Sequence, residues 1–170
     1  MKREHLYWAF IGGGAVVIGV LVAWMAGAFQ QEKPLPPVPV VIERLNKPAS
    51  AEQQVGAAKD LIRHGAKART EVRAALANHA KYEPEVMAPL LQATMKNRDY
   101  QSMPVLLDLL DHPDPLVRGR AAAAAQQILG GRINYRANDA PEVRAKAAAE
   151  IRRQYEELKP RLVEFYETGK

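Results

Sequence analysis

The chain has 170 residues, of which 48% are hydrophobic and 6% aromatic, and its formal net charge is +5. It contains no cysteine, which excludes disulfides, thiolate metal sites and cysteine nucleophiles. Alanine, leucine, arginine and glutamate dominate after the first third, so the composition predicts an all-α fold.

The first expected element is a transmembrane helix at residues 6–29, preceded by a short tail at residues 1–5. No residue of the 6–29 stretch is charged, and about 20 apolar residues are enough to span the hydrocarbon core. Tyr7, Trp8 and Trp24 stand near its two ends, where interfacial aromatic side chains are expected. The sequence therefore predicts a single-pass membrane protein.

A cleaved signal peptide is the alternative for this segment. Lys2 and Arg3 form a basic start, and residues 26–28 (Ala-Gly-Ala) resemble a small-x-small cleavage site. The apolar stretch exceeds the usual length of a signal-peptide core, which favours the uncleaved anchor. Lys2 and Arg3 precede the apolar stretch, whereas Glu32 and Lys33 follow it. Because the cytoplasmic flank of a membrane helix carries the excess of lysine and arginine, this distribution predicts a cytoplasmic N-terminus and a periplasmic or otherwise extracytoplasmic C-terminal domain.

Small side chains recur every fourth residue along the expected anchor, at Ala15, Gly19, Ala23 and Gly27. Such ridges let two membrane helices approach closely. The ridge predicts a homo-oligomer through the anchor, or docking on another membrane helix.

Residues 30–48 form the next segment, which contains five prolines. Because proline fixes φ and has no N–H donor, the segment is expected to be an extended, polyproline-like spacer that holds the domain about 50 Å from the bilayer. The apolar sequence VPVVIERL at residues 38–45 suggests an alternative, in which this part docks along the first repeat.

Residues 49–170 are expected to form a domain of helical repeats. A shift of 31 residues places Val55, Val86 and Val117 in one column, and a period of this size in a helical background indicates stacked helical pairs. Capping residues and apolar spacing predict helices near residues 51–64, 67–81, 84 onward, 102–111, 114–130 and 139 onward. In the last of these, Pro160 is expected to cause a kink or a break, and an apolar stripe is expected to be buried: Val143, Ala147, Ile151, Tyr155, Leu158, Leu162 and Phe165.

Part of this domain resembles a HEAT repeat. The run Asp114-Pro115-Leu116-Val117-Arg118, followed by Ala121-Ala122, is similar to the second helix of a HEAT hairpin, and residues 103–110 are similar to the first. The closing segment, with Tyr135 and Ala140-Pro141, is similar to that of bacterial membrane-anchored HEAT-repeat proteins. The resemblance implies a short right-handed α-solenoid, in which an arginine at the position of Arg118 bridges to a neighbouring repeat.

No catalytic, cofactor-binding or metal-binding constellation stands out, so we expect a protein without enzymatic activity and without cofactors. The four histidines lack partners at ligand spacing, and phosphate-loop and nucleophile-elbow motifs are absent. The leading hypothesis is a membrane-tethered scaffold for protein–protein interaction, with an unidentified protein partner. Its expected contact residues are Arg118, Arg120 and Arg144.

Two alternatives come from other classes of function. The first is a basic module that binds nucleic acid or anionic lipid through Arg118, Arg120, Arg132, Arg136, Arg152 and Arg153. An external domain disfavours nucleic acid. The second is a single-pass accessory subunit that joins a larger membrane complex through its anchor.

Overall fold

The computed structural model describes residues 34–168, and every regular element in this range is helical. The prediction of an all-α protein is therefore confirmed for these residues. The α-helices are α2 (Val38–Asn46), α3 (Ala51–His64), α4 (Arg69–Ala77), α5 (Pro84–Asn97), α6 (Met103–Asp108), α7 (Pro115–Leu129) and α8 (Pro141–Thr168). Four short 3-10 segments lie between them: η1 (Gly65–Ala68), η2 (His79–Lys81), η3 (Tyr100–Ser102) and η4 (Leu109–Asp111).

The expected anchor at residues 6–29, with its ridge of Ala15, Gly19, Ala23 and Gly27, lies outside the described residues. Within residues 34–168, no helix is both long enough and apolar enough to cross a bilayer.

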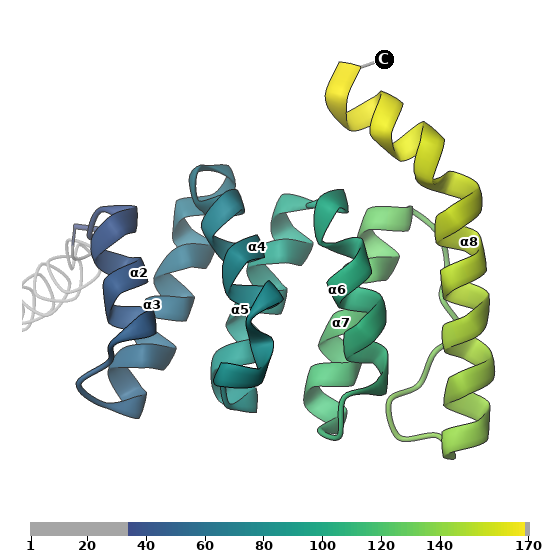
Figure 1. Cartoon of the computed structure of the whole chain (residues 1–170), viewed down its shortest axis with the longest axis horizontal. Helices are drawn as coiled ribbons and strands as arrows, with labels where there is room; N and C mark the ends of the chain where they lie inside the picture. The colour runs from purple at the N-terminus through teal and green to yellow at the C-terminus, as the bar shows by residue number, and fades with distance from the viewer. Residues whose placement is uncertain (1–33, 169–170) are drawn as a thin grey trace, which may run out of the picture. The chain divides into compact units, whose positions relative to one another are not determined.

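The helices form a row of antiparallel hairpins (Figure 1). α2 pairs with α3, α4 with α5, and α6 with α7, while α5 also packs directly on both α3 and α7. Figure 1 shows α2, α4 and α6 toward the viewer, and we call them the front helices; α3, α5 and α7 lie behind and are called the rear helices. α8 closes the row by packing on α6 and η3. The arrangement is that of a short α-solenoid.

Capping residues set the ends of the rear helices. The Ser50 hydroxyl accepts a hydrogen bond from the first turn of α3, and the Asp114 carboxylate accepts two from the first turn of α7. Both satisfy backbone N–H groups that have no partner within the helix. Gly65 and Gly130 follow the C-terminal ends with φ of 58° and 71°, a region that glycine adopts without steric cost. The ends predicted for these two helices are confirmed.

The repeat is less regular than the sequence predicts. α3 begins at Ala51, α5 at Pro84 and α7 at Pro115, at intervals of 33 and 31 residues. The 31-residue register holds between α5 and α7, so Val86 and Val117 are equivalent and both are buried. Placing Val55 in the same column was wrong, because α4 is longer than α6, which lengthens the interval from α3 to α5. Val55 is only half-buried.

The prediction of an extended spacer over residues 30–48 was wrong for residues 38–46, which form α2. Pro39 lies in the first turn, where the missing N–H costs no hydrogen bond. Val41 and Leu45 are fully buried against α3. The alternative, that this apolar segment docks along the first repeat, is confirmed, and α2 supplies the front helix of the first hairpin.

The closing helix α8 is continuous from Pro141 to Thr168 with Pro160 inside it, and its axis changes direction in its upper part (Figure 1). The helix therefore bends and does not break. The stripe expected to be buried is only partly so. Ile151 and Tyr155 are buried, whereas Val143 and Phe165, near the two ends of the helix, are 53% and 59% exposed.

The core runs between the front and rear helices. The apolar pattern expected near residues 102–111 is confirmed, since Met103, Leu106, Leu107 and Leu110 are all buried. Leu90 and Leu91 of α5 occupy the positions that Ala121 and Ala122 hold in α7, and all four are buried. The core thus accepts large or small side chains at equivalent positions.

Candidate interaction surface

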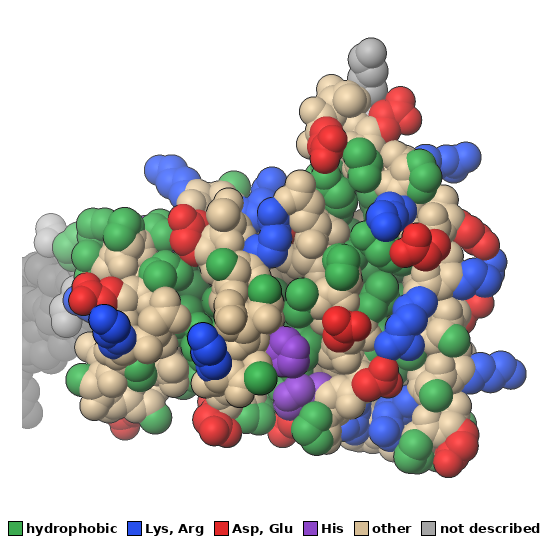
Figure 2. Space-filling model, in the orientation of Figure 1, with side chains coloured by type: hydrophobic (Ala, Val, Ile, Leu, Met, Phe, Trp, Pro, Cys, Tyr) green, Lys and Arg blue, Asp and Glu red, His purple; other side chains and the backbone are tan. Residues whose placement is uncertain are grey.

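The rear helices present one continuous row of exposed side chains, which we call the rear face. On each helix these residues recur at intervals of three, four or seven, which places them on one side. They are Glu52, Lys59 and Arg63 on α3; Glu85, Gln92 and Lys96 on α5; and Leu116, Arg120, Ala123 and Gln127 on α7. The front differs, because Figure 2 shows acidic and basic side chains interspersed there.

Charge is separated along the rear helices. Acidic residues lie at their N-terminal ends, including Glu52 and Glu85, while cations lie at or just beyond their C-terminal ends. This follows the helix dipole, and each such placement contributes roughly 0.3–1 kcal/mol. The exposed cations at the C-terminal ends are called the basic edge: Lys67, Lys96, Arg98 and Arg132.

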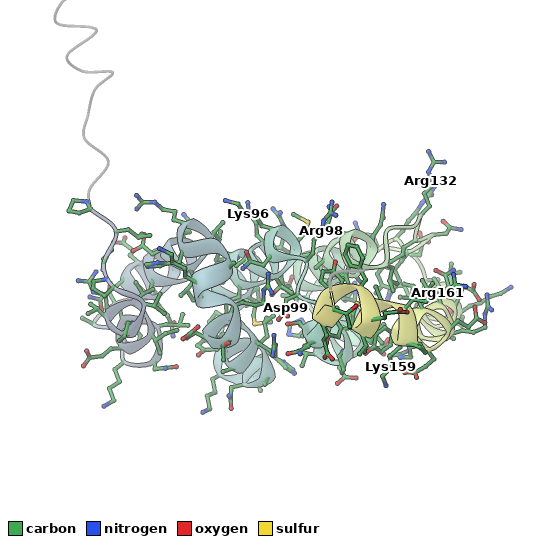
Figure 3. All side chains as sticks on the ribbon, turned by 90° about the horizontal axis from the view of Figure 1, so that it is seen from above. Lys96, Arg98, Asp99, Arg132, Lys159 and Arg161 are labelled. Atoms are coloured by element: carbon green, nitrogen blue, oxygen red, sulfur yellow. The ribbon has the colours of Figure 1, made fainter. Side chains whose placement is uncertain are left out.

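The basic edge is assembled from residues far apart in sequence. Lys96, Arg98 and Arg132 lie along one long side of the molecule in Figure 3, with Lys159 and Arg161 toward the other. Arg98 caps α5 in the left-handed conformation, with φ of 46°. A shallow hollow joins it to the end of α7, lined by Arg98, Gln126, Gln127, Gly130, Gly131 and Arg132.

Hydrogen bonds hold the ends of neighbouring rear helices together. The Asn97 side chain donates to the Gly65 carbonyl at 3.1 Å, and Arg69 donates to the Asn97 carbonyl at 3.4 Å. With its amide oxygen facing Arg98, Gln127 accepts from Arg98 Nη2 and Nε at 2.9 and 3.1 Å. The three C-terminal ends therefore form a fixed platform for the cations.

The acidic residue beside Arg98 does not neutralise this edge. Asp99 is 4% exposed and accepts two hydrogen bonds from Arg73, at 2.9 and 2.7 Å, and one from Ser102 at 2.7 Å. The hydrogen bond to Asp99 raises the pKa of Arg73, so the guanidinium stays charged. Asp99 serves to tie α4 to η3, and its charge is matched by Arg73.

Arg118, expected to contact a partner, is instead buried, at 8% exposed. Its Nη1 donates to the carbonyls of His112 and Pro113 at 2.7 Å each. Its Nε and Nη2 donate to the Ala137 carbonyl at 3.1 and 2.6 Å. Because carbonyls on both sides occupy the guanidinium, Arg118 holds the loop of residues 131–140 onto α7 and is not available to a partner.

Two more side chains fasten the same loop. Tyr135 donates to the Leu110 carbonyl, and burial raises the pKa of its phenol. Arg144 is half-buried and donates to the Asp139 carbonyl at 2.6 Å. Of the three arginines expected to bind a partner, only Arg120 is fully exposed, and it lies on the rear face.

The basic set predicted between Arg118 and Arg153 is not one surface. Arg152 pairs with Asp111 at 2.8 Å and also donates to the Leu107 carbonyl. Arg153 pairs with Glu150 at 2.6 Å and with Glu157 at 2.5 Å. Hydrogen bonding to Arg153 lowers the pKa of Glu150 to about 2. The cations of α8 are thus largely matched by carboxylates of the same helix or of the η4 turn.

Histidines and carboxylates do not converge in the part of the chain that the structure describes, where no group of three or more could hold a metal ion. Two of the histidines form hydrogen bonds with backbone groups. His64 Nε2 donates to the Pro36 carbonyl at 2.8 Å, and His112 Nδ1 accepts from the Asp114 N–H at 3.1 Å.

Comparisons with protein-family models, with curated proteins and with solved structures give no match for this chain.

Proposed function

We propose that this chain is a membrane-tethered interaction module without catalytic activity, built from HEAT-like helical hairpins. The apolar segment at residues 6–29 anchors it as a single-pass protein with a cytoplasmic N-terminus. Its rear face binds a partner protein outside the cytoplasm.

The observation that carries this proposal is the direct packing of the three rear helices into one row. Stacked hairpins of this kind offer an extended surface, which suits a protein segment better than a small molecule. Its carboxylates, Glu52 and Glu85, lie at one end; Lys59, Gln92 and Ala123 lie in the middle; and Arg63, Lys96 and Gln127 lie at the other end. A partner with cations that face the carboxylate end would be held in one orientation.

The contact residues differ from those expected from sequence. Arg120 stays a contact residue, because it is exposed in the first half of α7. Gln92 and Ala123 replace Arg118 and Arg144, since they lie at the centre of the rear face. Residues near the centre of an interface contribute most of the binding energy, so these positions are the best probes.

Site-specific photo-crosslinking in cells tests the proposal. A photoreactive amino acid at Gln92 or Ala123 should give the same discrete adduct, while one at exposed Ala74, on front helix α4, should give none. Adducts from the front position alone, or from no position, would contradict rear-face binding. Resistance of the chain to alkaline extraction from membranes tests the tether separately.

The second candidate is an accessory subunit that assembles through its anchor, supported by the small-residue ridge of Ala15, Gly19, Ala23 and Gly27. This function predicts that a complex purified in detergent survives deletion of residues 49–170. Loss of the complex on that deletion favours the rear face. The same ridge could pair two copies, which Gly19→Leu with Ala23→Leu should prevent.

A further inference from the structure

We propose that the basic edge, Lys67, Lys96, Arg98 and Arg132, rests on the anionic lipid headgroups of the membrane that holds the anchor. This inference rests on the proposed membrane tether and specifies which edge of the helical domain faces the membrane. The cations face the bilayer, and the rest of the rear face, including Gln92, Ala123 and Arg120, stays open to a protein partner.

The chain enters the domain at this same edge. The Pro36 carbonyl accepts the hydrogen bond from His64, the last residue of α3. α2 then runs back along α3, away from that edge. The entry point and the C-terminal ends of the rear helices therefore share one side of the row.

The folding of residues 38–46 into α2 shortens the spacer. Five residues separate Phe29 from Leu35, and such a stretch reaches about 20 Å even when fully extended. An extended spacer of the length expected from sequence would have kept the domain well beyond the reach of the surface potential. A short one keeps the entry edge within about two Debye lengths of the headgroups.

The charges of this edge are available. Among residues 34–168, no ion pair involves Lys67, Lys96, Arg98 or Arg132. The acidic residues of the rear face lie mainly at the opposite ends of the helices, and Asp60, near this edge, pairs with Arg63 at 3.4 Å. Each cation near an anionic surface strengthens association about fivefold.

Lipid fits this edge better than nucleic acid does. Proteins that bind single strands stack bases on aromatic rings, and the hollow between Arg98 and Arg132 is lined by glutamines and glycines. Lipid headgroups need only point charges on an open platform. The cations lie on separate helix ends, which matches a surface of independent headgroups.

The absence of cysteine allows a direct test with the full chain in nanodiscs. A fluorophore is placed at Gln126→Cys, beside the basic edge, or at Leu116→Cys, about 15 Å away along the same helix. The discs contain phosphatidylcholine alone or mixed with phosphatidylglycerol, with a quencher on the lipid headgroups. We expect stronger quenching of the Gln126 probe than of the Leu116 probe, only in the anionic discs, and weakening with salt.

A charge variant and a matched control complete the design. Lys96→Gln with Arg98→Gln and Arg132→Gln should weaken contact with the anionic discs about a hundredfold, from three cations. Lys47→Gln with Lys81→Gln and Arg44→Gln removes the same charge from exposed sites away from this edge and should leave quenching unchanged. Equal quenching of both probes, or equal behaviour of both variants, would overturn the proposal.

Two further outcomes separate the competing explanations. If an RNA oligonucleotide binds the chain in neutral discs and the basic-edge variant abolishes this, the edge is a nucleic-acid site and the lipid proposal fails. If the chain does not insert into discs, the tether fails. Flotation with phosphatidylglycerol vesicles then decides the lipid proposal alone, since binding that depends on the basic edge supports it and absence of binding rejects it.

Discussion

Cations gather in two regions of this molecule, and the two regions use them differently. Around α7 and α8, arginine side chains are occupied: Arg118 by three carbonyls, Arg152 by Asp111 and Arg153 by two glutamates. At the basic edge, Lys96 and Arg132 extend from helix ends without an ion pair among the described residues. The first region is the richer in sequence, yet the second is the more available to a partner.

The comparison shows that the number of cations in a segment does not give its binding capacity. Long arginine side chains reach carbonyls and carboxylates within their own fold, and burial then favours those internal bonds. Cations at helix C-termini are stabilised by the dipole while their charged groups remain in water. The following predictions test this distinction, from the largest expected effect to the smallest.

Removing the buried arginine should have the largest effect. Arg118→Ala leaves the carbonyls of His112, Pro113 and Ala137 without their donor, and we expect a loss of about 3 kcal/mol in the free energy of unfolding. Urea unfolding followed by circular dichroism measures it. Arg120→Ala, two residues away and exposed, should change stability by less than about 0.5 kcal/mol. Equal effects would break the distinction between the two arginines.

The next effect concerns two neighbours in sequence, Arg98 and Asp99. Asp99→Ala removes the buried partner of Arg73 and Ser102 and should cost about 2 kcal/mol of stability. Arg98→Ala, at the exposed cap, should cost less, because the left-handed φ of this position disfavours arginine and alanine alike. The same unfolding measurement compares them, and a larger loss for Arg98→Ala would show that the edge cation is structural.

Removing the N-cap side chain should have a smaller effect on stability, and the effect should differ between the equivalent positions of α7 and α5. Asp114 accepts hydrogen bonds from the N–H groups of Leu116 and Val117, at 2.7 and 3.2 Å, while Glu83 makes no side-chain cap on α5. Asp114→Ala should therefore destabilise the protein by about 1 kcal/mol and Glu83→Ala by much less. Thermal unfolding tests the order of the two variants.

The smallest effect is a local titration on α8. Because Arg153 lowers the pKa of Glu150 from 4.5 to about 2, this pair favours the folded state above pH 4.5, and its contribution is lost as the pH falls toward 2. Arg153→Gln should raise the pKa of Glu150 toward its ordinary value, with the hydrogen bond from Gln154 still lowering it, as carbon NMR of the carboxyl group would show. A Glu150 pKa that stays low in that variant would mean that the ion pair is not the cause.

Much of the helical order follows from local chemistry. Ser50, Asp114, Gly65 and Gly130 act on backbone groups within one turn, so their spacing in the sequence predicts where α3 and α7 begin and end. The predictions that failed concern side chains whose burial depends on residues far away in the sequence. Arg118 is buried by a loop whose Ala137 carbonyl, 19 residues later in the sequence, accepts its hydrogen bond. No local sequence pattern predicts that contact.

The missed features have similar causes. The prolines at residues 34–39 led to the prediction of extended chain where α2 forms. A proline in the first turn of a helix is tolerated, and the burial of Val41 and Leu45 stabilises this helix. The basic edge was missed because Lys67, the pair Lys96 and Arg98, and Arg132 are separated by some 30 residues and meet only when the helices stack. Basic residues next to the predicted C-terminal ends, such as Lys96 and Arg132, were the available signal.

The far end of α8 has a consequence for exchange of backbone amides with solvent. The buried residues of this helix, Ala148, Ile151 and Tyr155, all precede Pro160. Beyond it, Tyr166 stacks on Tyr100 with ring centroids 5.1 Å apart, and Glu167 accepts from the Tyr100 hydroxyl. Few buried contacts hold the last two turns, so their backbone amides should exchange with solvent by local fraying. The amides before Pro160 should exchange only when a larger part of the domain unfolds. A single helix would then carry two protection levels, divided at one proline.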